Sequence, residues 1–290
     1  MTEQKRVTIV VPVYNEGDNI PHFTRAVMEA MTGLPYRYEL LFVDDGSRAE
    51  SCRVLRETER REPHVRAIFL SRNYGHQAAL TCGLDHAEGD AVITMDGDMQ
   101  HPPALLPRLL ALWEQGYEVV QTIRETTQGV SAFKRLTSKY YYKFLNLISE
   151  VPVQPGGSDF RLMDRKVVDA LMAMPEHDRF IRGMVSWLGF RQKPLPYKRD
   201  ARWAGETKYP LSKMIKFALT AISSFSTSPL KIASWVGFAT SGVAVFGMLY
   251  VLGLRLFTST WVEGWTALML AVLFIGGIQL LVLGIMGEYI

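Results

Sequence analysis

The stretch Ala91–Pro103 reads AVITMDGDMQHPP and places an acidic turn directly after a short apolar run. The run Ala91–Met95 is typical of a strand that is buried on both faces. Asp96 and Asp98 then flank a glycine that lets the backbone turn, so both carboxylates can face one cation. An isolated Asp-Gly-Asp is usually a solvated turn. Its place after a buried strand favours a functional site here.

Four more β-rich runs accompany this strand, and helical patterns separate them. Continuous apolar strands with helical crossovers predict an α/β domain whose mainly parallel sheet is covered on both faces. Ligands of such sheets bind beyond the carboxyl ends of the strands. The expected strands are Val7–Val13, Tyr38–Val43, Val65–Leu70, Ala91–Met95 and Tyr117–Thr122, and the expected helices are Ile20–Met31, Ala49–Arg60, Gln77–Ala87 and Ala104–Gln115.

Two other expected strands also end in acidic segments, PVYNE at 12–16 and VDDGS at 43–47. Carboxylates at three strand ends crowd negative charge at one edge of the sheet, which is costly unless a cation or hydrogen-bond donors lie there. Mg²⁺ and Mn²⁺ are commonly held by one or two carboxylates together with substrate phosphates. The sequence contains no Gly-rich phosphate loop, which counts against ATPases and dehydrogenases. We therefore expect Mg²⁺ or Mn²⁺ and a phosphate-bearing substrate.

The C-terminal part of the chain is almost free of charge. Ile232–Leu254 and Gly264–Gly287 contain no charged residue. Each is long enough to cross a hydrocarbon core of about 30 Å, so the sequence predicts a hairpin of two transmembrane helices. Two such bare spans favour packing with neighbouring chains, which makes a homo-oligomer a further expectation.

The segment before these spans is basic. Residues 193–231 contain eight Lys or Arg and two Asp or Glu, a net charge of +6. This pattern is typical of a cytoplasmic juxtamembrane region, and Leu211–Leu230 within it predicts an amphipathic helix at the membrane interface. The polar start Met1–Arg6 predicts that no signal peptide precedes the first strand. Nucleic acid is the competing partner of a basic patch, but no nucleic-acid motif accompanies this one, so we expect none.

Several motifs, each weak alone, together resemble family 2 glycosyltransferases. These motifs are PVYNE at 12–16, VDDGS at 43–47, SRNYG at 71–75, MDGDMQHPP at 95–103 and GSDFRL at 157–162. More narrowly, they are similar to the polyprenyl-phosphate glycosyltransferases, a group that includes dolichyl-phosphate mannose synthase and bacterial undecaprenyl-phosphate glucosyltransferases. The GETKY segment at 205–209 and the two expected spans fit the bacterial glucosyl branch.

This resemblance implies a cytoplasmic catalytic domain of GT-A fold at residues 1–209, an amphipathic juxtamembrane segment at 210–231 and a transmembrane hairpin at 232–290. It implies an enzyme of the bacterial inner membrane that needs Mg²⁺ or Mn²⁺. The enzyme would move a hexose, first of all glucose, with inversion from a UDP-sugar to undecaprenyl phosphate. The product would be a lipid-linked monosaccharide for modification of cell-envelope glycans.

The resemblance and the expected fold also assign roles to individual residues. The donor nucleotide is expected at Pro12, Tyr14, Glu16, Asp44, Asp45 and Asp96, the metal at Asp96, Asp98 and Gln100, and the reacting groups at Asp98, Asp159 and Arg124. A phosphate monoester is already anionic at neutral pH, so we expect cationic side chains to matter more than a base. The candidates for binding the acceptor phosphate are Arg124, Lys134, Arg135, Arg202 and Lys208. Asp159 could act as a base or orient an arginine, and the orienting role is favoured.

Three alternatives stay open. The transferred sugar could be mannose, galactose or aminoarabinose. A processive polysaccharide synthase on the same fold would carry a Gln-x-x-Arg-Trp signature, but Gly183–Trp187, the nearest candidate, lacks both the Gln and the Arg. A non-catalytic membrane protein that binds nucleotide sugars is a third alternative, and the intact Asp96 and Asp98 pair argues against it.

Overall fold

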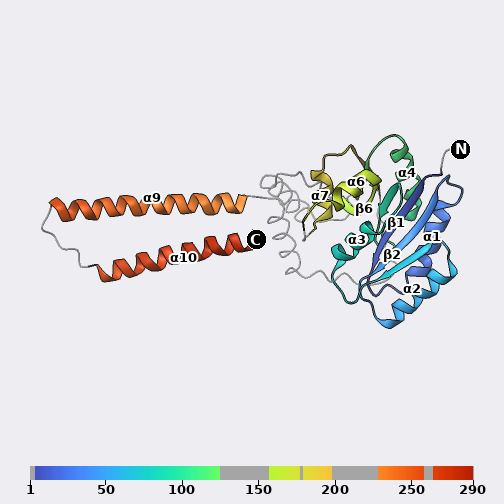
Figure 1. Cartoon of the computed structure of the whole chain (residues 1–290), viewed down its shortest axis with the longest axis horizontal. Coiled ribbons are helices and arrows are strands. Elements are labelled where there is room, and N and C mark those ends of the chain that lie inside the picture. The colour runs from blue at the N-terminus through green and yellow to red at the C-terminus, as the bar shows by residue number, and fades with distance from the viewer. Residues whose placement is uncertain (1–3, 125–156, 177–178, 198–227, 258–263, 290) are drawn as a thin grey trace, which may run out of the picture. The chain divides into compact units, whose positions relative to one another are not determined.

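The computed structural model describes residues 4–124, 157–176, 179–197, 228–257 and 264–289 (Figure 1). The chain divides into two compact units. The first contains a β-sheet with its surrounding helices, and the second contains two long C-terminal helices. Residues 211–227 of the expected interfacial segment lie outside the described residues, and its last three residues begin the first C-terminal helix.

The first unit is built on a seven-stranded sheet of order β3-β2-β1-β4-β6-β5-β7. Its strands are β1 (Arg6–Val13), β2 (Arg37–Asp44), β3 (Val65–Phe69), β4 (Ala91–Thr94), β5 (Val119–Arg124), β6 (Gly157–Asp164) and β7 (Gln192–Tyr197). All neighbouring strands are parallel except at β6, which runs antiparallel to both β4 and β5. The prediction of a mainly parallel sheet is confirmed, and the five expected strands are all present.

The helices follow the expected crossovers. They are α1 (Ile20–Met31), α2 (Ala49–Arg61), α3 (His76–Asp85), the 3₁₀ turn η1 (Pro103–Leu105), α4 (Leu106–Glu114), α6 (Arg165–Met172) and α7 (Ile181–Trp187). In α1 a proline occupies the first turn, where its missing N–H costs nothing, and the buried side chains recur every three or four residues. Asp164 caps the N-terminus of α6, because its carboxylate accepts a hydrogen bond from the Lys166 amide.

Close packing of α3 on the sheet sets the position of its first turn. An added Cβ at Gly83 would lie 2.2 Å from Val10 Cγ1 and 3.1 Å from Val43 Cγ2, so only glycine lets α3 approach β1 and β2 this closely. The helix follows β3 in the chain, and its N-terminus, His76, therefore lies at the carboxyl edge of the parallel strands.

The reversed direction of β6 brings a later part of the chain to the same edge. Thr94 at the end of β4 pairs with Arg161 in the middle of β6, and the Thr94 hydroxyl donates a hydrogen bond of 2.5 Å to the Asp159 carbonyl. An antiparallel strand presents its beginning where its parallel neighbours present their ends. Asp159 therefore lies beside the acidic turn that follows β4.

The second unit consists of α9 (Ser228–Phe257) and α10 (Trp265–Tyr289), which pack against each other. They coincide with the two expected apolar spans, so the helical part of that prediction is confirmed. Large apolar side chains are exposed on both helices, for example Phe246 on α9 and Leu280 on α10. Within the described residues, no helix is long and apolar enough to cross a membrane. Membrane crossing stays a prediction.

Candidate functional site

Loops from different strand ends are joined by hydrogen bonds at the carboxyl edge. Ser47 in the VDDGS loop accepts a hydrogen bond on its hydroxyl from the Asn15 amide, at 2.8 Å. In return, the Asn15 side-chain oxygen accepts from the Arg48 amide at 2.9 Å. Asn15 has a φ of 56°, a left-handed conformation that asparagine tolerates better than most residues. The loops after β1 and β2 therefore form one rigid ledge.

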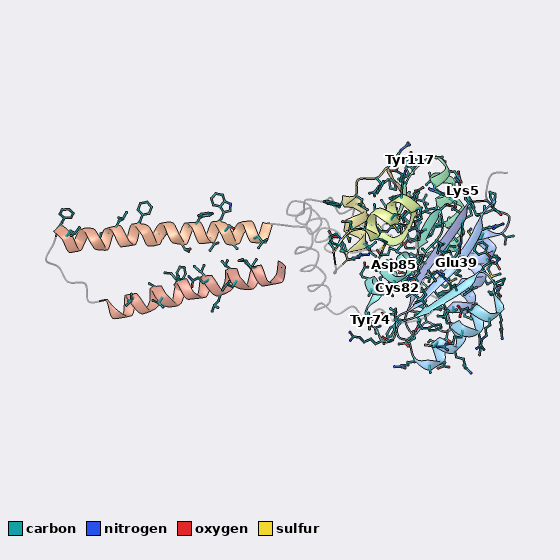
Figure 2. All side chains as sticks on the ribbon, in the orientation of Figure 1. Lys5, Glu39, Tyr74, Cys82, Asp85 and Tyr117 are labelled. Carbon is teal, nitrogen blue, oxygen red and sulfur yellow. The ribbon has the colours of Figure 1, made fainter. Side chains whose placement is uncertain are left out.

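Asp45 fastens a third loop to this ledge. Its two carboxylate oxygens accept hydrogen bonds from the amides of Tyr74 and Gly75, at 2.7 and 2.9 Å, and the side chain is buried. Figure 2 labels Tyr74, whose side chain is exposed. Charge-assisted bonds to two successive amides are strong, so they fix the start of α3 relative to β2. The sequence assigned Asp45 to the donor nucleotide, and the structure engages both of its oxygens in holding the Ser71–Gly75 loop.

Gly46 makes this junction possible. Its φ is +70°, and an added Cβ would lie 2.3 Å from the Arg72 carbonyl carbon and 2.6 Å from the Asn73 nitrogen. Real Cβ atoms do not approach backbone that closely, so a side chain at this position would separate the two loops.

The candidate donor-binding residues lie on the same ledge. Asp44 is buried and accepts from the Ser47 amide at 3.0 Å and from the Cys52 thiol at 3.5 Å. Pro12 is buried near the end of β1, whereas Tyr14 is half-exposed and offers an aromatic face. Glu16 accepts a hydrogen bond from the Asn19 side-chain amide. An open aromatic ring beside buried carboxylates suits a nucleoside.

The acidic turn after β4 has the ligand chemistry of a hard cation. Asp98 accepts from the Gln100 amide at 3.1 Å and also from the Gln100 side chain. The Gln100 side-chain oxygen is buried with no hydrogen-bond partner, which is costly unless a donor or cation completes it. Two carboxylates and an amide oxygen fit Mg²⁺ or Mn²⁺, with substrate oxygens as further ligands. No set of three His, Cys, Asp or Glu residues in the described ranges could hold a metal by itself.

The surroundings of Asp96 disfavour the ionised form of its carboxyl group. Burial raises the pKa of its carboxyl group, and the neighbouring Asp159 and Asp98 raise it further, whereas His101 and His76 act in the opposite direction. The His101 ring stacks on Phe160 and its Nδ1 accepts a hydrogen bond from the Asp96 amide at 3.1 Å. A cation bound here would favour the ionised carboxylate, as a metal site requires.

Asp159 lies at the centre of a cationic cluster. Its Oδ1 is 3.2 Å from Arg161 Nη2, and its Oδ2 is 3.1 Å from Arg182 Nη2 and 3.6 Å from His76 Nε2. Burial alone would raise the pKa of Asp159, but the hydrogen bond with His76 and the charges of Arg182 and Arg161 hold it well below its usual range. Asp159 is therefore a carboxylate that organises cations.

The same histidine links the cluster to the acidic turn. His76 Nε2 lies 3.7 Å from Asp96 Oδ1, so the ring stands between the carboxylates of Asp96 and Asp159. Arg161 is fully buried, and burial lowers its pKa to about 10 even though Asp159 raises it. Sequence spacing gave no role to His76 or Arg182, because their contacts with Asp159 cross 83 and 23 residues of chain. The position of His76 directly after the SRNYG motif was the one available signal.

Most of the cationic residues that the sequence assigned to the acceptor phosphate are not among the described residues. Arg124 ends β5, where its backbone pairs with Tyr197. Lys134, Arg135, Arg202 and Lys208 lie outside the described residues.

Residues 8–172 match the family model described as Glycosyl transferase family 2. The chain is 44% identical over 290 residues to an uncharacterized glycosyltransferase, YkcC, of Bacillus subtilis, covering 100% of this chain and 90% of that protein. It is 37% identical to a prophage bactoprenol glucosyl transferase homolog of Escherichia coli, covering 98% and 93%. It is 35% identical to the bactoprenol glucosyl transferase of Shigella phage SfV, also covering 98% and 93%.

Two solved structures have a similar fold at low sequence identity. Glucosyl-3-phosphoglycerate synthase from Mycobacterium tuberculosis, solved with Mn²⁺, UDP and glucosyl-3-phosphoglycerate, aligns with a TM-score of 0.51 at 16% identity, covering 76% of this chain and 78% of that one. The mannosyltransferase PcManGT from Pyrobaculum calidifontis, solved with GDP-Man and Mn²⁺, aligns with a TM-score of 0.50 at 15% identity, covering 99% and 88%. These similarities confirm the expected GT-A fold.

Proposed function

The chain belongs to glycosyl transferase family 2 and is therefore a glycosyltransferase, and we propose that it transfers glucose from UDP-glucose to the phosphate of a membrane polyprenol, undecaprenyl phosphate. The observation that carries this proposal is the pairing of the acidic turn at Asp96 and Asp98 with the cationic cluster around Asp159. The first suits a metal-bound diphosphate, and the second suits an anionic acceptor. Similarity along nearly the full length to proteins named bactoprenol glucosyl transferases supports glucose and the lipid acceptor.

On the donor side, Pro12, Tyr14, Glu16 and Asp44 bind the nucleoside. Asp96, Asp98 and Gln100 hold Mg²⁺ or Mn²⁺, which when bound neutralises charge on the diphosphate leaving group. Asp45 acts indirectly, because its carboxylate fixes the loop that starts α3. The ledge thus positions the sugar C1 at the carboxyl edge of the sheet.

On the acceptor side, a phosphate oxygen of the lipid attacks C1 as the bond from C1 to the diphosphate oxygen breaks. UDP leaves with the bonding electrons, and a single displacement of this kind inverts the configuration at C1. The phosphate is already anionic and needs no proton removed. The positive charges that bring two anions together are assigned to Arg124, Lys134, Arg135, Arg202 and Lys208, with Asp159 orienting arginines.

A donor panel tests the reaction. Purified protein in detergent is given undecaprenyl phosphate and, in turn, radiolabelled UDP-glucose, UDP-galactose and GDP-mannose, and the lipid-soluble product is measured. We expect one glucose per lipid from UDP-glucose and far less product from the other donors. Growth of a polymer would point to a processive synthase, and labelled water-soluble sugar without lipid product would contradict transfer to a polyprenol.

We also propose that α9 and α10 anchor the enzyme in the bacterial inner membrane with the catalytic domain, residues 1–209, in the cytoplasm. The support is the exposed apolar side chains of both helices, such as Trp235 and Leu280, which water solvates poorly. The basic segment at 193–231 would then face anionic headgroups, and residues 210–231 would lie at the interface.

Alkaline carbonate extraction checks the anchor. When membranes from cells that make the protein are washed with carbonate, we expect the protein to stay in the pellet, because apolar helices in the bilayer resist a treatment that breaks ionic contacts. A high-salt wash should also leave it in place. Release of the full-length chain by either wash would show that it is held only by surface charge.

A further inference from the structure

We propose that Arg182 and His76 bind the phosphate of the acceptor lipid, with Asp159 holding both side chains in place. Neither residue was among the cations that the sequence assigned to the acceptor. The inference rests on the proposed function and names the contacts that would form one side of its acceptor site. It also makes Asp159 a positioning residue instead of a general base.

The charges around Asp159 favour an added anion. Its single carboxylate faces two guanidinium groups, those of Arg161 and Arg182, and among the described residues it is the one carboxylate that either arginine pairs with. This one carboxylate balances one of the two positive charges, and the neighbouring carboxylates of Asp96 and Asp98 belong to the proposed metal site. The Arg182 Nε group is also a buried donor with no hydrogen-bond partner. A phosphate would supply both the missing charge and acceptor oxygens.

Exposure separates the residues that can touch a ligand from those that cannot. The Arg161 side chain is 1% exposed and that of Asp159 is 13% exposed, so these two residues are expected to position the exposed side chains without contacting the ligand. Arg182 and His76 are 30% and 43% exposed and can be reached from solvent. The Arg182 guanidinium donates to Asp159 through Nη2. A planar guanidinium group can make two parallel hydrogen bonds to phosphate oxygens.

His76 places this anion next to the donor. Its Nε2 lies 3.7 Å from the Asp96 carboxylate, which belongs to the proposed metal site. An anion in contact with His76 and Arg182 is therefore a neighbour of the leaving diphosphate, where an attacking phosphate oxygen has to be. The Asp45 carboxylate holds the Gly75 amide directly before His76, so the donor ledge itself fixes this distance.

Asp159 is poorly suited to take a proton. Both of its oxygens already accept from cationic donors, and the proposed nucleophile carries its own negative charge. Its contacts with the two arginines fit the task of holding them apart at a fixed spacing. This makes a clear kinetic distinction between a base and a positioning residue, because a base changes kcat and a holder of phosphate ligands changes the KM for the acceptor.

The experiment measures steady-state kinetics in detergent, with undecaprenyl phosphate and UDP-glucose varied in turn. For Arg182→Gln we expect the KM for the acceptor to rise about ten- to hundredfold, the loss typical of one charge-assisted contact, with the KM for UDP-glucose within about twofold. Arg182→Lys should recover part of the loss, because the lysine ammonium keeps the positive charge but cannot make the bidentate contact of a guanidinium. Detergent removes the membrane, so a change in anchoring cannot produce this pattern.

Arg179→Gln is the matched control. Arg179 lies three positions away, and its guanidinium donates to the carbonyls of Met172, Met174 and Glu176. Its replacement should leave both KM values unchanged, with thermal melting used to compare the two variants. An unchanged acceptor KM in folded Arg182→Gln would overturn the inference, as would an equal rise in both variants.

Asp159→Asn gives a second, independent readout. A positioning role predicts that the KM for the acceptor rises as the arginines lose their anchor, whereas a base predicts a lower kcat at an unchanged acceptor KM. The second result would contradict our assignment of Asp159. The wild-type protein is assayed first, so its failure to glycosylate any lipid phosphate would count against the proposed function and would be distinguishable from failure of the Arg182 contact.

Discussion

Replacing Asp98 by asparagine is expected to lower the rate of sugar transfer by about a thousandfold while the protein stays folded. A catalytic metal contributes several kcal/mol of charge stabilisation in the transition state, and about 1.4 kcal/mol corresponds to a tenfold change in rate. Asparagine keeps the side-chain oxygen that accepts from the Gln100 amide, so the turn itself should survive. Initial rates with saturating UDP-glucose and acceptor measure the effect.

Two further measurements make this result specific. Asp85→Asn removes a carboxylate at the exposed end of α3 (Figure 2) and should leave the rate unchanged. Excess EDTA should abolish transfer by the wild-type protein, and added Mn²⁺ or Mg²⁺ should restore it. Full activity in EDTA would show that the reaction needs no divalent metal. It would then contradict the assignment of Asp96, Asp98 and Gln100 as metal ligands.

Gly46→Ala is expected to have the largest effect on stability, a loss of about 2–5 kcal/mol in the free energy of unfolding. A left-handed backbone costs a residue with a side chain about 1–2 kcal/mol, and forcing a methyl group into occupied space adds about 1–3 kcal/mol. Here the φ is +70° and the obstacle is the Arg72 backbone, which cannot rotate away as a side chain can. Urea unfolding followed by tryptophan fluorescence measures the change.

Gly33→Ala isolates the role of the loop contact. Gly33 has a φ of +78° but no atom within 4 Å of an added Cβ, so its replacement carries only the backbone cost of about 1–2 kcal/mol. The difference between the two variants therefore measures the contact of Gly46 with the Ser71–Gly75 loop. Equal destabilisation would mean that this contact contributes nothing.

The first five strands could be predicted because most of their residues are apolar. In β1 all residues but the first are buried, and a run of this kind stands out in any window of the sequence. The β6 and β7 strands were missed for two different reasons. The fully buried Arg161 interrupts the apolar pattern of β6 and is tolerated only because Asp159 pairs with it. β7 contains Pro194 and Pro196, which its edge position in the sheet allows.

The candidate site could be predicted only as far as it follows strand order. Asp44 and Asp96 come directly after apolar runs, so the topology of a parallel sheet brings them to one edge. The contacts of Asp159 with His76 and Arg182 depend on β6 running backwards, and hydropathy carries no information about strand direction. The hydrogen bond from the Gly75 amide to Asp45 likewise joins two segments that are far apart in the sequence, and no local sequence pattern indicates that they lie close together.

Because β6 runs in the reverse direction, different parts of the chain supply the residues proposed for the donor and for this side of the acceptor site. The residues assigned to the donor all lie within the first hundred, whereas Asp159, Arg161 and Arg182 all come after the start of β6. Evolution could therefore exchange the stretch after the start of β6, and with it this part of the acceptor site, while leaving the donor-binding loops unchanged. His76 belongs to the first stretch but contacts Asp159 in the second, so we expect such an exchange to preserve this histidine.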